Sequence, residues 1–151
     1  EKWKEIIEKH IADKTVELTR EYGKRKGPWG DDLLNKALLH DLAPVYIEEQ
    51  YWDRLLEVVR TNADLNVLLS FHAHLSKRYP EEMLSLFVRE LESKGCRVNN
   101  RNEYAALAGD MLSIMKDMPA WANEIRATAR TLIALNPKRP AMKEELNRVL
   151  K

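Results

Sequence analysis

The sequence of 151 residues has little of what marks a disulfide-linked, sheet-rich or membrane protein. Its one cysteine, Cys96, excludes an internal disulfide and a multi-cysteine zinc site. Glycine and proline together supply only 11 residues, and Ile, Val and Thr together supply only 20. No apolar run approaches the roughly 18 residues that indicate a membrane-spanning helix, and no signal peptide is found. We therefore expect a chain with few turns, no membrane span and a cytoplasmic location.

The sequence also lacks an excess of charge of either sign. Lys and Arg number 25 and Asp and Glu number 24, which gives a net charge of +1. This balance offers no polyelectrolyte argument for nucleic acid or for an anionic membrane. What the chain has in quantity is leucine and alanine, 35 residues in all, and these residue types favour helices. The composition predicts an all-α fold and disfavours an enzyme built on a sheet.

Apolar residues recur at helical spacing along most of the chain, in about eight segments. The pattern predicts a leading helix over residues 1–23 and helical hairpins over residues 31–151, all within a single helical-repeat domain, 1–151. Residues 24–30 combine glycine, proline and basic side chains, and they are interpreted as the main linker.

Prolines and glycines predict where several helices begin and end. Pro80, Pro119 and Pro140 each precede an apolar stripe and are expected to open a helix. Pro44 lies inside a helical pattern, so we expect it to kink or end that helix. Gly95 is a favourable C-terminal stop, which would leave Cys96 in a turn between helices.

The connections between these helices are short, which makes consecutive helices antiparallel neighbours. The second helices of three predicted hairpins begin in a similar way, at Tyr51-Trp52, Tyr79-Pro80 and Met118-Pro119, and these starts are 28 and 39 residues apart. Helix-pair repeats have lengths of roughly 34 to 47 residues. We predict antiparallel hairpins stacked as a short right-handed α-α superhelix, with a compact helical bundle as the alternative.

In the segment 104–127 an aromatic residue, Tyr104, is followed by Leu107 and the small Ala108, and later by the small Ala120 and Ala127. In this pattern the segment resembles the tetratricopeptide repeat. Ala108 stands at the glycine position of that family, and the closing proline is not in register. The resemblance implies a superhelix of tetratricopeptide type without a clean consensus.

Three further motifs are the tail 135–146 (LNPKRPAMKEEL), the segment 78–82 (RYPEE) and Tyr104 with Leu107 and Ala108. In these motifs the chain resembles, over residues 33–150, the C-terminal helical region of bacterial SWIM zinc-finger proteins. The family's Cys-x-Cys and Cys-x-His signature has no counterpart here, so the resemblance assigns no residue of this chain a role in zinc binding. The chain starts without Met inside helical periodicity, and we expect a fragment with the zinc module upstream.

Titratable side chains give no catalytic or metal-binding pattern. His72 and His74 project about 200° apart on a helix, so they cannot share a metal ion, and His72 is interpreted as a hydrogen-bonded core histidine. His40 and Asp41 diverge by about 100°, which disfavours a catalytic dyad. Paired carboxylates are interpreted as solvated helix faces. We expect no catalytic residue, cofactor or metal, and no enzyme.

The partner-binding residues that we predict are Trp29, Arg126 and Arg130. Trp29 lies in a Gly-Pro-Trp-Gly segment off any helix, either as an exposed anchor or as a plug over a helix end. Arg126 and Arg130 share a helical face. With other basic residues near turns they form either a phosphate-binding stripe or ordinary solubilising charge. Those other basic residues are Lys24, Arg25, Lys26, Arg97, Arg101, Lys138 and Arg139.

The function that we expect is a non-catalytic scaffold, which presents a helical surface to a protein or peptide partner within a larger bacterial protein. The alternative is a nucleic-acid-binding helical module that accompanies an upstream zinc finger. The sequence predicts no oligomeric state.

Overall fold

The computed structural model describes residues 2–22 and 28–151, without the side chains of residues 28–31. Within these residues the chain forms eight α-helices and one short 3-10 helix, and it forms no β-strand. The all-α prediction is confirmed. Within the same residues, no helix combines the length and the apolar character that crossing a membrane requires.

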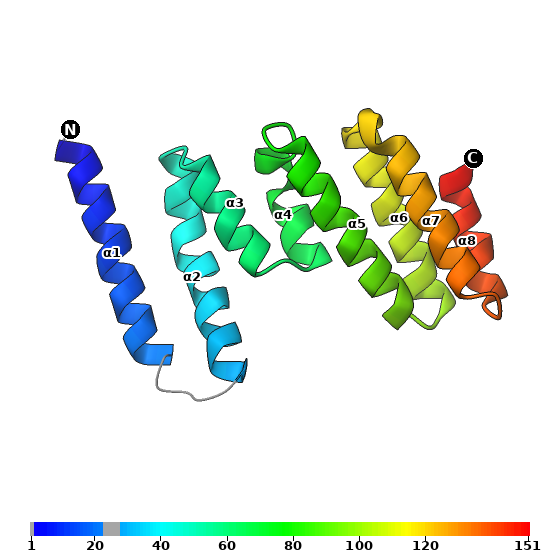
Figure 1. Ribbon diagram of the computed structural model, residues 1–151, viewed down its shortest axis with the longest axis horizontal. Coiled ribbons are helices and arrows are strands. Elements are labelled where there is room, and N and C mark those ends of the chain that lie inside the picture. The colour runs from blue at the N-terminus through cyan, green and yellow to red at the C-terminus, as the bar shows by residue number, and fades with distance from the viewer. Residues whose placement is uncertain (1, 23–27) are drawn as a thin grey trace. The chain divides into compact units, whose positions relative to one another are not determined.

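The chain divides into two compact units, Glu1–Val67 and Leu68–Lys151. The first contains three whole helices: α1 (Lys2–Tyr22), α2 (Pro28–Glu48) and α3 (Trp52–Thr61). Consecutive helices of this unit run in opposite directions, and α2 packs against both α1 and α3 (Figure 1). Their buried side chains recur at helical spacing and form the core of the unit: Ile11, Leu18, Leu42, Ala43, Tyr46, Leu55, Leu56 and Val59.

One expectation for the first unit is wrong. Helix α2 begins at Pro28, inside the linker expected over residues 24–30, and residues 23–27 lie outside the described residues. Proline suits a first helical position because its missing N–H has no partner there in any case. Of the two outcomes expected at Pro44, a kink or an end, the helix does not end there and continues to Glu48. The burial of Leu42, Ala43 and Tyr46 around this proline favours continuing the helix despite the lost hydrogen bond.

Helix α4 (Leu65–Leu75) follows, and the side chain of Asp64 caps its start, since its Oδ1 accepts a hydrogen bond of 2.8 Å from the Val67 amide. The second unit then contains α5 (Pro80–Arg97), α6 (Arg101–Asp117), η1 (Pro119–Trp121), α7 (Ala122–Leu135) and α8 (Pro140–Leu150). The three prolines predicted to open helices open α5, η1 and α8.

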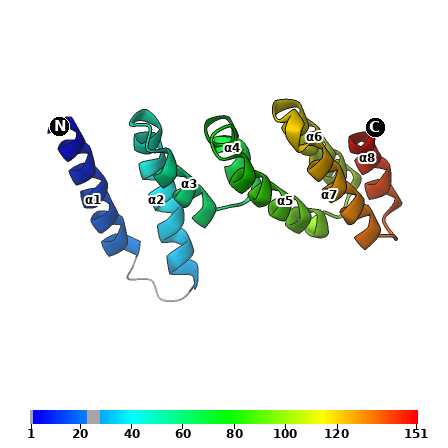
Figure 2. The same ribbon diagram turned by 45° about the horizontal axis from the view of Figure 1, so that its top comes forward.

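The helices of the second unit, from α5 onward, again alternate in direction (Figure 2). Each packs not only on its neighbour but also on the next helix but one, α5 with α7 and α6 with α8. Helical hairpins stacked on one another produce this pattern of contacts. The side chains at its centre are fully buried: Met83, Phe87, Leu91, Leu107, Met111, Ile114, Ile125, Leu132, Met142 and Leu146.

Gly95 does not end α5, as the sequence suggested, because the helix continues to Arg97. Gly95 is buried, and a Cβ atom added to it would lie 2.5 Å and 2.6 Å from the two Cδ atoms of Leu132 on α7. The glycine is therefore a point of close approach between α5 and α7. Cys96 lies exposed in the last turn of α5 rather than in a connecting turn.

The start of α6 is capped by side chains in an arrangement similar to a capping box. The side chain of Asn100 accepts a hydrogen bond of 2.9 Å from the Glu103 amide. The carboxylate of Glu103 in turn accepts one of 3.3 Å from the Asn99 amide. Two amides at the helix start are thereby satisfied by side chains.

Candidate partner-binding surface

Helix α7 has one buried side and one exposed side. Ile125, Thr128, Ala129 and Leu132 are buried against the rest of the second unit. Five positions of its last three turns are exposed, and we call them the α7 face: Ala127, Arg130, Thr131, Ala134 and Leu135.

The α7 face is mostly apolar. The Leu135 side chain is 63% exposed, one of the most exposed large apolar side chains in the described residues. The Thr131 hydroxyl donates a hydrogen bond of 3.0 Å to the Ala127 carbonyl on its own helix, which leaves its methyl group as the outward feature. These five residues carry no carboxylate and their one charge is that of Arg130, whereas the exposed Glu124 lies one turn before Ala127. This combination suits a partner that is apolar and acidic.

Arg126 and Arg130, both predicted as partner contacts, lie one turn apart on α7. Arg126 is half-buried, and its Nε lies 3.4 Å from the carbonyl oxygen of Val149 in the last turn of α8. Carbonyls in a last turn lack intrahelical donors, so Arg126 satisfies one of them and ties α7 to α8. Arg130 is exposed to solvent.

Trp29, the third predicted contact, lies on the backbone of α2, so the prediction that it stands off any helix is wrong. Its side chain is outside the described part of the structure. It belongs to the first unit, whereas Arg126 and Arg130 belong to the second.

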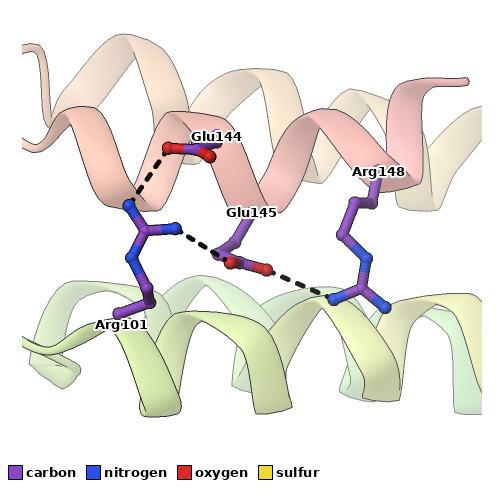
Figure 3. Close-up of polar contacts among 4 residues, drawn as sticks. All are labelled: Arg101, Glu144, Glu145 and Arg148. Atoms are coloured by element: carbon purple, nitrogen blue, oxygen red, sulfur yellow. Dashed lines mark hydrogen bonds and ion pairs between the residues drawn. The ribbon is translucent and has the colours of Figure 1, made fainter.

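Several basic residues of the predicted phosphate-binding stripe are engaged within the second unit. Arg101 at the start of α6 forms ion pairs of 3.0 Å with Glu144 and 3.2 Å with Glu145 on α8 (Figure 3). Glu145 also pairs with Arg148 at 3.2 Å. This charge network connects α6 to α8, and Arg101 is already neutralised by protein carboxylates.

A second basic residue of the stripe is also structural, because Arg139 donates a hydrogen bond of 2.7 Å to the Val98 carbonyl. Arg97 and Lys138 are exposed, whereas residues 24–26 are outside the described residues. Fewer free cations release fewer counterions from a phosphate backbone. The geometry therefore does not support a phosphate-binding stripe formed by these basic residues.

His72 is a buried, hydrogen-bonded histidine, as the sequence predicted, with 8% of its surface exposed. Its Nδ1 is hydrogen-bonded to the Ser76 hydroxyl, and its ring lies 5.2 Å from that of Phe87 and 5.8 Å from that of Trp121. The other ring nitrogen, Nε2, lies 3.4 Å from Asp117 without forming a well-directed hydrogen bond. Burial lowers the pKa of His72, and this outweighs the opposing effect of Asp117.

A cavity of about 250 Å³ lies beside this histidine and is lined by His72, Ser76, Lys77 and Asp117 among others. Serine, histidine and aspartate are the residue types of a hydrolytic triad. Ser76 is almost fully buried, however, and its hydroxyl is already hydrogen-bonded to Nδ1 of His72. The arrangement is that of a structural hydrogen-bond network.

The expectation that His40 and Asp41 diverge is wrong, because Nδ1 of His40 lies 2.9 Å from Oδ1 of Asp41. This contact lowers the pKa of Asp41. The His40 side chain is almost fully exposed, and general acid–base catalysis gains nothing from so solvated a pair. Among the described residues, no three His, Cys, Asp or Glu side chains converge as metal ligands would.

Comparison with family models, with curated proteins and with solved structures finds no match to this chain. The resemblances to the tetratricopeptide repeat and to the SWIM proteins therefore stay predictions. The feature that sequence reasoning missed is the exposure of Leu135, which was grouped with the tail motif. Helical periodicity gave no signal for it, because Leu135 follows the buried Leu132 by three residues and so lies near the buried stripe rather than opposite it.

Proposed function

We propose that this chain is a non-catalytic helical-hairpin module that binds a protein partner through the α7 face, as part of a larger bacterial protein of the SWIM type. The observation that carries the proposal is Leu135, a large apolar side chain exposed on a helix that carries no acidic residue over its last three turns. Exposed apolar surface rimmed by polar residues is typical of interaction sites.

The partner that fits this face is an amphipathic helix with acidic residues beside its apolar stripe. Ala127 and Ala134 allow a second helix to approach to the roughly 8–10 Å at which helices pack. Leu135 supplies apolar area at one end, and Arg130 supplies a cation that pairs with a carboxylate at the margin. A basic partner would meet the charge of Arg130 without compensation.

The alternative, a nucleic-acid-binding module, has weaker support. Arg101 and Arg139 form contacts inside the second unit, and Arg126 reaches the end of α8. A phosphate backbone would have to displace these contacts before it could pair with those side chains.

The proposal is tested by selecting displayed helical peptides against the whole chain, with an R130E/A134E double variant as the counter-selection target. Both positions are exposed, so the variant keeps the core intact. The matched control is K143E, a charge reversal at an exposed position on α8. We expect acidic amphipathic peptides that bind the wild type and K143E, and that bind the double variant at least about tenfold more weakly.

Peptides that bind all three proteins equally would refute the proposal, as would a selection that enriches nothing. Salt-dependent binding of RNA or DNA that is lost on Arg126→Ala with Arg130→Ala would favour the nucleic-acid alternative instead.

A further inference from the structure

Helix α1 packs against the rest of the first unit with one side only. Ile11 and Leu18 are its buried residues, and Figure 1 shows α2 on one side of α1 within that unit. Three of the four exposed large apolar side chains in the described residues lie on this helix, since Trp3, Ile6 and Val16 are each more than half exposed. Apolar exposure concentrated on one helix is typical of a surface that binds another molecule.

The side of α1 that faces away from its buried residues carries a seam with alternating steps of four and three residues. We call it the α1 seam: Lys2, Ile6, Lys9, Asp13, Val16 and Arg20. At about 100° per residue the seam is centred roughly 180° from Ile11 and Leu18, and all six of its residues are exposed. This spacing keeps one side of a helix in contact with a second helix over several turns.

The α1 seam is complementary to itself when two copies meet antiparallel. A pair centred at residue 11 places Ile6 opposite Val16 of the second copy, and Lys9 opposite Asp13 of the second copy. Two-fold symmetry repeats each contact, which gives two apolar contacts and two ion pairs along one seam.

The charges at the middle of the seam are available for these ion pairs. Lys9 and Asp13 are exposed, and within the described part of the chain neither has an ion pair or a hydrogen bond. They lie one turn apart on α1, but a lysine that precedes its acidic partner is in the less favourable order for pairing within a helix.

The charge pattern also selects the orientation of the two helices. A parallel pair would place Lys9 against Lys9 and Asp13 against Asp13, and opposed like charges disfavour association. At the ends of the antiparallel pair, Lys2 faces Arg20 of the second copy. Glu17 and Glu5 of that copy each lie one turn away, so both cations have a carboxylate within reach.

We propose that two copies of this chain associate through the α1 seam as an antiparallel, two-fold symmetric helix pair. The occupant is a second copy because the residues that fit the seam are those of the same helix read in reverse. Helix α1 has 21 residues and is about 31 Å long, and four apolar side chains meet in the pair. An interface this small is reversible, with an expected dissociation constant of about 10–100 µM. The seam belongs to the first unit, whereas the α7 face belongs to the second.

Sedimentation equilibrium of the whole chain, from about 5 µM to about 1 mM, tests the association. We expect a monomer–dimer equilibrium that added salt weakens, because its ion pairs are exposed. The variant I6S/V16S removes the apolar contacts and should raise the dissociation constant at least about tenfold. The matched control for charge reversal is K4E, an exposed position on the other side of α1, which should leave the dissociation constant unchanged.

A charge exchange tests the antiparallel pairing itself. K9E places a glutamate opposite Asp13 of the second copy, and D13K places a lysine opposite Lys9, so each variant alone should associate at least about fivefold more weakly. In a mixture of the two variants both ion pairs have opposite charges again, so a heterodimer should form with nearly the wild-type affinity. The K9E/D13K double variant should recover for the same reason. Circular dichroism shows that each variant is folded before it is compared.

A chain that stays monomeric at about 1 mM would overturn the proposal, as would a dimer that I6S/V16S leaves intact. Recovery when K9E is mixed with the wild type, but not when it is mixed with D13K, would indicate a parallel pair and refute the seam. The variant R130E/A134E should leave the association unchanged. Loss of the dimer in that variant alone would assign self-association to the α7 face instead.

Discussion

Replacing Gly95 with alanine has two opposing effects on the free energy of unfolding. Gly95 lies inside α5, where alanine is favoured over glycine by about 1 kcal/mol through helix propensity alone. Its new Cβ atom would lie 2.5 Å from Cδ2 and 2.6 Å from Cδ1 of Leu132. Leu132 must therefore move by about 0.9 Å to reach ordinary contact at 3.4 Å.

Packing decides the sign of this change. Leu132 is fully buried, and both of its Cδ atoms meet the new Cβ, so turning one methyl group away does not relieve the clash. Overpacking of this kind costs about 1–3 kcal/mol, and a site with two close contacts lies in the upper part of that range. After the propensity gain we expect Gly95→Ala to lower the free energy of unfolding by about 1–2 kcal/mol.

Gly109 provides the matched control. It lies in the interior of α6, and a Cβ atom added there would meet nothing within 4 Å. Only the propensity effect remains, so we expect Gly109→Ala to raise the free energy of unfolding by about 0.5–1 kcal/mol.

The assay is native-state hydrogen exchange of the amides of α5, α6 and α7, because it reports on the second unit without assuming that both units unfold together. The variant L132V removes both Cδ atoms, and in that background Gly95→Ala should be less destabilising than in the wild type. If Gly95→Ala stabilises the second unit as much as Gly109→Ala does, the close approach of α5 and α7 described above is refuted.

Three further perturbations follow from the same unit. Asn100→Ala removes the capping acceptor for the Glu103 amide and should lower the free energy of unfolding by about 1 kcal/mol in urea denaturation, whereas Asn100→Asp should be nearly neutral. The pKa of His72 is lowered from 6.5 in the folded chain, so the unfolded chain binds more protons below that pH. Stability is therefore full above about pH 6.5 and falls as the pH drops through the folded value. The thermal midpoint measured across this range should depend less on pH in His72→Gln, and an unchanged dependence would contradict the assignment. Arg101→Met removes both bridges to α8 and should accelerate amide exchange in α8, by less at high salt. An effect independent of salt would mean that the bridges contribute through packing instead.

The helix starts were predictable because they depend on local chemistry. A missing N–H costs nothing at the first position of a helix, where Pro80, Pro119 and Pro140 lie. The side-chain oxygen of Asp64 is close enough to accept a hydrogen bond from the Val67 amide. The same proline rule indicates Pro28, but the glycines around it pointed to a linker instead.

Errors arose where distant residues decide the outcome. A glycine that ends a helix and a glycine that admits a neighbouring helix look alike in sequence, and only Leu132 on α7 distinguishes them for Gly95. The candidate surface was predicted in part, since Arg126 and Arg130 were singled out from their helical face. The contact of Arg126 with Val149 and the exposure of Leu135 depend on how α7 and α8 pack.

The aromatic contacts among His72, Phe87 and Trp121 make Trp121 an intrinsic fluorescence probe of the second unit. Trp121 is 4% exposed in the second unit, whereas Trp3 in the first is 60% exposed and its indole N–H donates to Glu49 at 3.0 Å. A shielded indole emits at shorter wavelength and resists a dissolved quencher, and a solvated one does neither. Trp121 is the one tryptophan in the sequence of the second unit, whereas Trp3, Trp29 and Trp52 belong to the first. Unfolding of the second unit can therefore be followed in the unlabelled chain by the emission wavelength and the quenching of Trp121.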